Sequence, residues 1–273
     1  TLRKKLNSKI ISDIFQVDLY KNNRLQYSFL TEDEFLILDI NGNLVKKISH
    51  KKSSSEKFLS VFDYDNNRNY RFVIQDGKSL KMLDSKLNTV KGFKRNKLNS
   101  DIKFPIKHVR ILNKDYLLLV SKNNKPLILD RRGNIRIKLP ENFTTSTNHF
   151  YENDGGIITI NDLNQLVRIE LNGKISSKQL PDQKNMIHSN KNNLIVLSNG
   201  NVTINNNDFK IPFGDFDDLN IKGPKNNTYF HFRDVNEKKS YLYNSNGIIS
   251  GFPIYSTSTF EFSFDKNQDF ITF

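Results

Sequence analysis

The sequence predicts an all-β fold, a β-propeller of four-stranded antiparallel blades with six full blades and a partial seventh. Two observations lead to this prediction. One hairpin pattern recurs, in which an apolar strand ends at Asp or Asn, a Gly-type turn follows, and a second strand begins. The recurrence has a period of roughly 40–50 residues with several strands per unit, which is the signature of propeller blades. No segment has the pattern of a helix of convincing length.

The recurring hairpin is clearest where Asn-Gly separates two alternating strands. Both residues of this pair accept the positive φ of a type I′ turn, so Asn-Gly is the strongest short-range hairpin signal. The hairpin turns fall at Asn41-Gly42, at Asp84 to Asn88, at Gly133-Asn134, at Asn172-Gly173 and at Asn246-Gly247.

Apolar, aromatic and β-branched runs between these turns suit a pleated, half-buried surface and give the strands. The first three units are expected at residues 14–19, 25–31, 34–40 and 44–49; at 57–63, 69–75, 79–84 and 89–94; and at 105–112, 115–121, 126–130 and 135–139. The next three are expected at 145–151, 156–161, 165–171 and 175–180; at 184–189, 193–198, 201–205 and 209–213; and at 217–222, 227–233, 240–244 and 251–255.

Both ends of the chain contribute to the partial seventh blade. Residues 259–264 and 270–273 have the pattern of two strands, and residues 1–10 alternate like one more. A propeller closes by completing one blade from both chain ends, because an open ring would expose sheet edges. We expect a single β-propeller domain over residues 1–273. Because the chain starts at Thr1 rather than Met, we also expect it to be a trimmed product or a piece of a longer protein.

Composition narrows the classes of function. The chain has 273 residues and a formal net charge of +13, and it contains no cysteine, which excludes disulfides and thiolate metal sites. The charge is typical of an anionic partner such as nucleic acid, but it is spread along the chain, and clustering is what marks a nucleic-acid footprint. No run of 18 apolar residues occurs, so we expect no membrane span.

Two loops carry alternating Asp and Asn residues that could hold calcium, which takes six to eight hard oxygen ligands. The candidate metal ligands are Asp63, Asp65 and Asn67 in one loop and Asp265, Asn267 and Asp269 in the other. Neither loop has Gly at its bend or a later bidentate carboxylate. The alternative is an Asx-turn, in which the Asp side chain accepts hydrogen bonds from backbone N–H groups two residues on.

No catalytic constellation is evident. The five histidines show no metal-ligand spacing, and neither a Gly-x-Ser-x-Gly elbow nor a phosphate-binding Gly-rich loop occurs. We therefore expect a protein that is not an enzyme and has no cofactor apart from calcium.

Several segments resemble one group of proteins. They are Ile14 to Gln26, Ser60 to Asp65, Gly92 to Lys94, Tyr241 to Gly247 and Gly251 to Ile254. These segments resemble the C-terminal propeller-like region of large, uncharacterised proteins of flavobacteria and their relatives. The resemblance implies that this chain is the C-terminal part of a longer protein, and that the protein is exported and has a periplasmic or outer-membrane-associated location. Some members carry the label ribonuclease HII, but this chain lacks the helices and the Asp-Glu-x-Gly motif of such nucleases.

The leading hypothesis is a non-enzymatic scaffold or binding module of the bacterial cell envelope, whose loops contact a protein or glycan partner, because binding residues concentrate on loops held by a rigid frame. One alternative is a hydrolase or lyase that uses the central funnel of the propeller, with two carboxylates about 5–10 Å apart if it cleaves glycosides. The other is a basic nucleic-acid-binding surface, which predicts steep salt dependence.

Overall fold

The structure is a computed structural model that describes residues 5–50, 53–181, 184–223, 227–258, 261–264 and 269–272. It divides into two compact units, Thr1–Asn148 and His149–Phe273, and each unit is described by itself. All regular elements of the described residues are strands, and none of these residues forms a helix that could cross a membrane. The expectation of a single domain over residues 1–273 stays a prediction.

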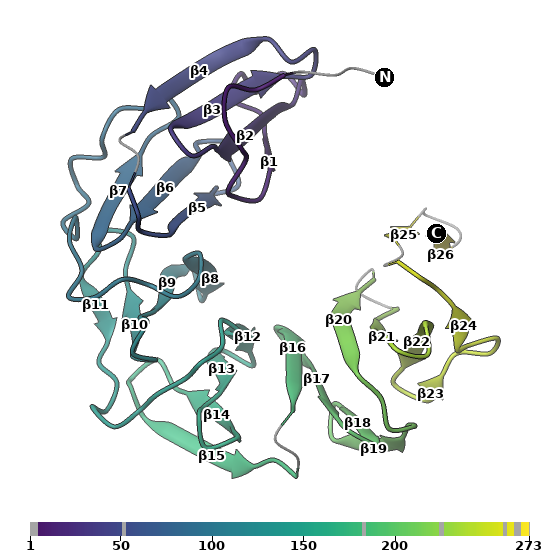
Figure 1. The fold of residues 1–273 in the computed structure, drawn as a ribbon. Helices are drawn as coiled ribbons and strands as arrows, with labels where there is room; N and C mark the ends of the chain where they lie inside the picture. The colour runs from purple at the N-terminus through teal and green to yellow at the C-terminus, as the bar shows by residue number, and fades with distance from the viewer. Residues whose placement is uncertain are drawn as a thin grey trace. The chain divides into compact units, whose positions relative to one another are not determined.

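Unit 1 contains three antiparallel sheets in chain order (Figure 1). The first sheet has the strands β1 (Phe15–Val17), β2 (Gln26–Leu30), β3 (Glu34–Asp39) and β4 (Leu44–Ser49). The second has β5 (Lys57–Phe62), β6 (Arg71–Asp76) and β7 (Ser79–Leu83). The third has β8 (Lys107–Ile111), β9 (Lys114–Val120), β10 (Pro126–Leu129) and β11 (Ile135–Ile137).

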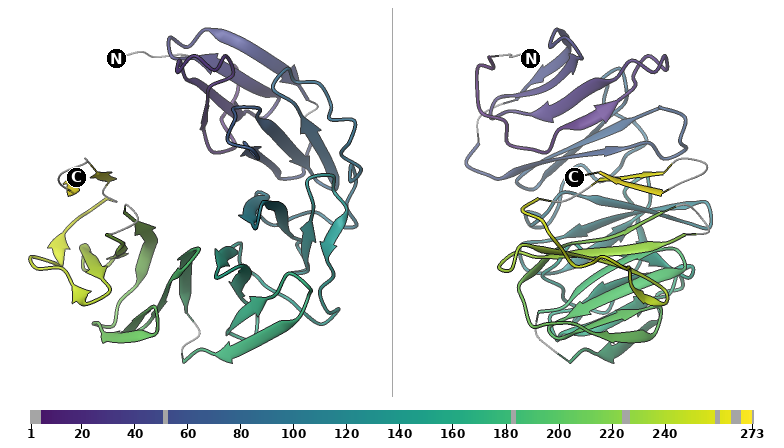
Figure 2. Two further views of the ribbon diagram at one scale, coloured as in Figure 1. Left: turned by 180° about the vertical axis from the view of Figure 1, so that it is seen from behind. Right: turned by 90° about the vertical axis from the view of Figure 1, so that its right-hand side faces the viewer.

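Unit 2 contains three larger sheets and one hairpin. The first sheet has β12 (Tyr151–Asn153), β13 (Gly156–Ile160), β14 (Gln165–Ile169) and β15 (Ile175–Gln179); the second has β16 (Met186–Asn190), β17 (Asn193–Ser198), β18 (Asn201–Ile204) and β19 (Asn207–Lys210). The third has β20 (Phe216–Lys222), β21 (Tyr229–Asp234), β22 (Lys239–Asn244), β23 (Gly247–Ile248) and β24 (Ile254–Tyr255), and the hairpin has β25 (Glu261–Phe264) and β26 (Asp269–Thr272). The sheets follow one another in chain order, as the colours in Figure 2 show. Their first strands, β12, β16 and β20, are in contact in turn.

A sheet that lies between two other sheets has apolar side chains on both of its faces, because successive residues of each strand point to opposite faces. In β6, Phe72 packs toward the first sheet, where its ring centroid lies 5.1 Å from that of Phe35. Its neighbour Val73 faces the third sheet and packs in a cluster with Leu117 and Leu119. Successive side chains of a strand point to opposite faces, so one strand contributes to two cores. Full burial of a side chain such as Phe72 is worth roughly 1.5–3 kcal/mol.

In unit 2, too, one strand contributes side chains to the cores on both faces of its sheet. Val196 of β17 packs with Ile158 of the preceding sheet, while Ile195 and Leu197 pack with Phe232 of the following sheet. Covering both faces requires continuous apolar runs such as Leu194 to Leu197, and these runs are why the strands could be located from the sequence.

The fourth strand expected at residues 89–94 is absent, which corrects the sequence prediction. Only isolated bridges join this segment to β7, at Leu83–Thr89 and Ser79–Lys97. Between these bridges the chain turns toward the third sheet, where the Lys94 N–H donates to the Arg132 carbonyl (2.8 Å) and Arg95 Nε donates to the Gly133 carbonyl (2.9 Å). The Lys94 N–H, which a fourth strand would have used for pairing, is therefore bonded to the third sheet instead.

Two other expected strands differ from the structure. Residues 5–9 form no strand, and Ile10 makes only an isolated bridge with Thr31. The strand expected at 145–151 begins at Tyr151, because the segment before it bonds elsewhere: the Thr145 N–H donates to the Asn124 carbonyl and Asn148 Nδ2 donates to the Pro105 carbonyl.

The recurring hairpin is real, but its turn differs from the type I′ prediction. At Asp39 the side-chain Oδ1 accepts from the N–H groups of Asn41 (2.9 Å) and Asn43 (2.8 Å), and the Asp39 carbonyl accepts from the Gly42 N–H. Gly42 has a φ of 76°, whereas Asn41 is not among the residues with positive φ. This is a three-residue loop that ends in a left-handed residue. The same pattern of bonds occurs at Asp84, Asp130 and Asn161.

Candidate functional site

The loop between β5 and β6 contains three of the predicted metal ligands. Asp63 begins the loop, and its two carboxylate oxygens each accept one backbone hydrogen bond, from Asn67 (3.1 Å) and from Arg68 (2.7 Å). The Asn67 side-chain oxygen accepts from the Asn69 N–H at 3.0 Å. The Asp63 and Asn67 side chains thus fold their own loop. Asn67 makes the bond to the N–H two residues on that defines an Asx-turn, whereas Asp63 bonds the N–H groups four and five residues on.

The loop between β1 and β2 has the same construction. Asp18 Oδ1 and Oδ2 accept from the N–H groups of Asn22 (3.1 Å) and Asn23 (2.9 Å), at the same two spacings as in the Asp63 loop. Burial opposes ionisation of Asp18, but these backbone hydrogen bonds and the nearby Arg68 lower its pKa. Two successive sheets of unit 1 therefore carry one repeated loop with a carboxylate at its base.

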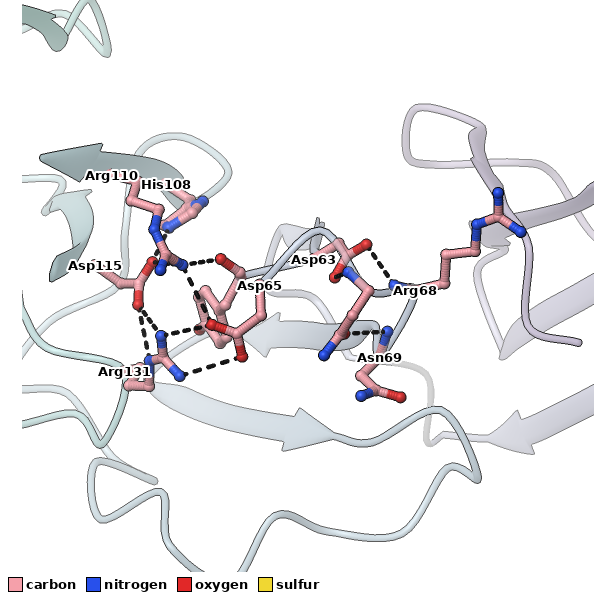
Figure 3. A network of polar contacts seen from close by, with 10 residues as sticks. Asp63, Asp65, Arg68, Asn69, His108, Arg110, Asp115 and Arg131 are labelled. Atoms are coloured by element: carbon pink, nitrogen blue, oxygen red, sulfur yellow. Dashed lines mark hydrogen bonds and ion pairs between the residues drawn. The ribbon is translucent and has the colours of Figure 1, made fainter. Parts of the chain in front are cut away.

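The side chain of Asp65 points out of this loop toward the third sheet (Figure 3). Its Oδ1 lies 3.2 Å from Arg131 Nη2 and 3.3 Å from Arg110 Nη1. Hydrogen bonds from Arg131 and Arg110 lower the pKa of Asp65. The structure therefore does not bring Asp63 and Asp65 together as a pair of ligands, because one folds the loop and the other binds two arginines.

A second carboxylate, Asp115 at the start of β9, completes the network around these arginines. It is only 2% exposed, and Arg131 Nε donates to its Oδ2 at 2.8 Å. Arg110 Nη1 lies 3.4 Å from its Oδ1, and His108 Nε2 lies 2.9 Å from the same oxygen. Burial lowers the pKa of His108, although Asp115 opposes this change, so the imidazole is neutral at pH 7.

Aromatic rings close the network on its apolar side. The Arg131 guanidinium carbon lies 5.1 Å from the ring centroid of Tyr64, a geometry for cation–π attraction. The His108 ring meets the Tyr64 ring edge-on, with centroids 5.1 Å apart. Burial raises the pKa of Tyr64, so its hydroxyl stays protonated at neutral pH. Both oxygens of Asp115 accept from charged or ring N–H groups of its own sheet, so this carboxylate fixes the two arginines that bind Asp65 of the second sheet.

The same loop also binds the first sheet. Arg68 Nη1 donates to Asp18 Oδ2 at 2.7 Å, and Arg68 Nη2 donates to Asn23 Oδ1 at 2.9 Å. The hydroxyl of Tyr70 accepts from the Asp18 N–H at 3.1 Å. We call residues Asp63 to Tyr70 the connector loop, since its side chains and backbone bind both neighbouring sheets of unit 1.

The other predicted ligands lie largely outside the described residues. Asp265 and Asn267 fall between 265 and 268, which the structure does not describe, and Asp269 begins β26, of which only the backbone is described. No group of three or more His, Asp or Glu side chains that could hold a metal occurs in the described part of the chain. Calcium binding stays a prediction.

Unit 2 has its own buried histidine beside a carboxylate. His231 in β21 is 1% exposed, and its Nδ1 lies 3.2 Å from Asp218 Oδ2. Burial lowers the pKa of His231 to about 4 and raises the pKa of Asp218. Beside them, Arg233 binds Asp217 through two parallel hydrogen bonds of 2.9 and 2.6 Å. Asp218 reaches the histidine because the β20–β21 register shifts between Asp217 and Asn220.

Sequence reasoning missed Arg110 and Arg131 as partners of Asp65, and it missed Asp115 as the buried carboxylate that binds the same arginines. These residues lie 45 to 66 positions from Asp65, and no local pattern announces such pairing. One signal was available: Asp115 directly precedes the apolar run Tyr116 to Val120, and a carboxylate at the edge of a buried strand needs a partner.

Comparisons with known proteins show the fold. No family model matches the chain. No curated protein matches its sequence at a significant level. Among solved structures, BBS1N in complex with ARL6DN is 14% identical with a TM-score of 0.58, covering 96% of this chain and 87% of that one. BamB from Moraxella catarrhalis is 13% identical with a TM-score of 0.55, and the match covers 97% of this chain and 82% of BamB. The dihydro-heme d1 dehydrogenase NirN is 11% identical with a TM-score of 0.57, and the match covers 94% of this chain and 58% of NirN.

The class of the protein follows from its sheets and from these likenesses. The chain has an all-β, β-propeller fold, which confirms the fold class predicted from the sequence. Six antiparallel sheets and one further hairpin correspond to the expected six blades and partial seventh, with three strands instead of four in the second sheet. Likenesses at this level of identity show the fold alone.

Proposed function

We propose that this protein is a non-enzymatic scaffold or binding module that holds a protein or glycan partner through its loops. The observation that carries the proposal is the connector loop. Arg68 on one side and Asp65 on the other fix it to both neighbouring sheets, so the loops of unit 1 form a rigid frame. A rigid frame lowers the entropy that a loop loses when it binds a partner.

Exposed apolar side chains lie at the tips of two hairpins in this frame. Tyr20, in the β1–β2 loop, is 60% exposed, and Leu112, in the β8–β9 turn, is 75% exposed. Leu112 also has a φ of 47°, a left-handed conformation that a leucine adopts only at a cost. Exposed tyrosine is enriched at protein interfaces, and strained exposed residues concentrate at functional positions.

The fold neighbours support a binding role in general terms. BBS1N was solved in complex with ARL6DN, which makes it a propeller bound to another protein. The location in the bacterial cell envelope, and membership in a longer polypeptide, rest on the resemblance to the flavobacterial proteins and belong to the proposal.

The two alternatives make different predictions. A hydrolase or lyase needs free carboxylates, but Asp65 and Asp115 are both bound by arginines. A nucleic-acid-binding surface needs unpaired positive charge, and Arg68, Arg110 and Arg131 do not supply it because each is bound by a carboxylate. The remaining lysines keep that alternative testable, because each neutralised phosphate contributes about one counterion to the salt dependence of binding.

The test is affinity capture with the tagged chain from a flavobacterial envelope extract, beside a Tyr20→Ser/Leu112→Asn double variant. We expect one partner to be captured by the parent protein and to be lost from the double variant. Asparagine suits the left-handed conformation at position 112, so this change removes the apolar group without adding strain.

The matched control is Ile135→Ser, which removes an exposed apolar side chain from strand β11 instead of a loop. It should capture the partner as the parent protein does. Equal capture by all three proteins, or turnover of a glycan or ester substrate by the purified chain, would contradict the proposal.

A further inference from the structure

A small opening, which we call the window, lies between strand β7 and the segment that follows it. The Leu80 N–H donates to the Asn96 carbonyl (2.9 Å), and the Val90 N–H donates to the Met82 carbonyl (2.9 Å). Between these two bonds the segment leaves β7, so only the width of one residue, Lys81, is open along the strand. The chain itself therefore closes the window on both sides, and what enters it must be small.

Two backbone groups of β7 face the window. In an antiparallel strand, the N–H and C=O of one residue face the same side. Because the Leu80 N–H and the Met82 C=O bond to the segment, the Leu80 C=O and the Met82 N–H face the same way. Neither of these two groups has a hydrogen bond to any residue that the structure describes. The window thus presents one acceptor and one donor, on the two peptide groups that flank the Cα of Lys81.

A hollow of about 440 Å³ lies at the window, within the range of about 300–1,000 Å³ that is usual for ligand sites. Its apolar lining comes from Leu80, Met82, Val90 and Phe93. Three exposed lysines stand at its rim, Lys78, Lys81 and Lys97. No acidic residue is found among the described residues that line the hollow, and none of the three lysines forms an ion pair with any of the described residues. The hollow is therefore suited to an anion with an apolar part.

The third sheet holds the hollow open. The Lys94 N–H donates to the Arg132 carbonyl, and Arg95 Nε donates to the Gly133 carbonyl. Gly133 also lets the ring of Phe93 lie close, since a Cβ at that position would be 3.1 Å from Phe93 Cε2. The wall of the hollow is thus fixed by the neighbouring sheet, so the hollow is preformed.

We propose that the hollow binds a small carboxylate with a neutral hydrogen-bond donor beside its charge and an apolar side chain, which is the chemistry of an N-acylated apolar amino acid. The carboxylate accepts from the Met82 N–H and is attracted by Lys81 and Lys97, since hydrogen bonds to an ionised acceptor are the stronger ones. The ligand N–H donates to the Leu80 carbonyl. The apolar side chain lies on the apolar lining beside Phe93.

The covalent structure of an amino acid matches the window. Its nitrogen and its carboxylate share one carbon, as the two peptide groups that carry the free Leu80 C=O and Met82 N–H share the Cα of Lys81. The donor is neutral, because an ammonium would meet lysines and no carboxylate among the lining residues. The inference goes beyond the proposed function, because it concerns a small molecule and not the partner of the scaffold.

The two methionines of the chain, Met82 and Met186, make a direct test possible. The complete chain is labelled with ¹⁵N-methionine, so its amide spectrum reports on the window through Met82 and on strand β16 of unit 2 through Met186. The probe is N-acetylleucine, titrated at constant pH. We expect the Met82 amide proton to move to higher chemical shift and to saturate, because a bonded carboxylate deshields it, while the Met186 signal stays in place.

Three relatives of the probe each lack one of its groups. N-acetylleucinamide lacks the charge, 4-methylpentanoate lacks the N–H donor, and N-acetylglycine lacks the apolar side chain. Each should bind at least about fivefold more weakly than N-acetylleucine, because each leaves one feature of the hollow unused.

Two double variants separate the rim lysines from the general charge of the protein. Lys81→Gln/Lys97→Gln should weaken binding of N-acetylleucine about tenfold. Lys174→Gln/Lys178→Gln, the same charge change at exposed positions beside and within β15, should leave the affinity within about twofold.

The outcomes decide the inference. The absence of a saturable shift at Met82, an equal shift at Met186, or equal effects of the two double variants would each overturn it, as would binding of any of the three relatives as tightly as N-acetylleucine. Tighter binding of acetyl-Ala-Ala-Ala-Leu would assign the hollow to the chain end of a protein and overturn the small-molecule inference. The proposed function is tested separately, through capture that depends on Tyr20 and Leu112.

Discussion

The guanidinium of Arg131 lies against the buried carboxylate of Asp115, with Nε 2.8 Å from Oδ2. The same guanidinium also reaches Asp65 in the connector loop, with Nη2 3.2 Å from Oδ1. Arg131 thus joins a residue at the base of its own sheet to a loop of the preceding sheet. Desolvation opposes the charge of Arg131, but Asp115 and Asp65 together raise its pKa.

Replacing Arg131 with Ala should reduce the free energy of unfolding by about 2 kcal/mol, because it removes one partner of a buried carboxylate. Urea unfolding followed by circular dichroism measures this. Arg132→Ala is the control, since the Arg132 side chain is exposed one position away, and it should change stability by less than about 0.5 kcal/mol. Equal losses in the two variants would show that the network does not stabilise the fold.

Stability should fall in mild acid because of His231. The pKa of this histidine is about 4 in the folded protein and 6.5 ordinarily. Between these values the unfolded chain binds a proton that the folded chain does not, so stability is present above pH 6.5 and is lost as the pH falls toward 4. The difference between the two pKa values corresponds to a loss of about 3 kcal/mol at most in the free energy of unfolding. The raised pKa of Asp218 acts in the opposite direction and reduces the net loss.

The measurement is the urea midpoint of the parent protein and of His231→Gln at pH 7, 6, 5 and 4.5. Glutamine does not titrate, so the variant should show a shallower dependence on pH, even if it is less stable at pH 7. Parallel curves for the two proteins would assign the acid sensitivity to other groups.

Two glycines of the second and third sheets should respond differently to alanine. Gly133 has a φ of 81°, and a Cβ there would meet the Arg95 backbone nitrogen at 2.9 Å, so Gly133→Ala should cost about 2–3 kcal/mol. Gly92 has no left-handed φ, and nothing lies within 4 Å of its Cβ position, so Gly92→Ala should be neutral or stabilise by about 0.5 kcal/mol. Thermal unfolding of both variants tests the contact, and similar melting temperatures would contradict it.

Calcium should have little effect through the Asp63 loop, because Asp63 folds the loop and Asp65 binds arginines. We expect EGTA or about 1–10 mM CaCl₂, which exceeds the Kd of about 0.1–1 mM of weak calcium sites, to leave the melting temperature of the protein unchanged. If calcium raises it, comparison of Asp63→Asn with Asp269→Asn identifies the loop responsible. Loss of the calcium effect in Asp63→Asn would contradict this expectation and would show that the Asp63 loop binds calcium.

Much of the fold was predictable because it is encoded locally. Strands such as Glu34–Asp39 and Asn193–Ser198 have continuous apolar runs, and their turns carry Asp, Asn and Gly at fixed positions. The missing fourth strand was not predictable. Residues 89–94 have a pattern that is compatible with a strand, and what excludes it is a pair of bonds to Arg132 and Gly133, some 38 positions away.

The candidate site divides in the same way. The Asp63 loop was recognised because its Asp and Asn residues alternate, and the Asx-turn that it forms depends on near neighbours. The direction taken by Asp65 depends on Arg110 and Arg131, whose approach requires the third sheet to be in place. Local chemistry is therefore readable from the sequence, whereas the choice between metal ligand and ion-pair partner is made by tertiary structure.

The hairpin that closes at Asp39, Asp84 and Asp130 has a consequence for engineering. Five consecutive residues hold the hydrogen bonds that close each turn, from the carboxylate of the first to the amide of the fifth. The five residues at Asp39 and those at Asp84 could therefore replace one another without shifting the strand register. The Asp130 turn is different, because its Arg132 and Gly133 carbonyls also accept hydrogen bonds from Lys94 and Arg95, so exchange of this turn would alter the neighbouring sheet as well.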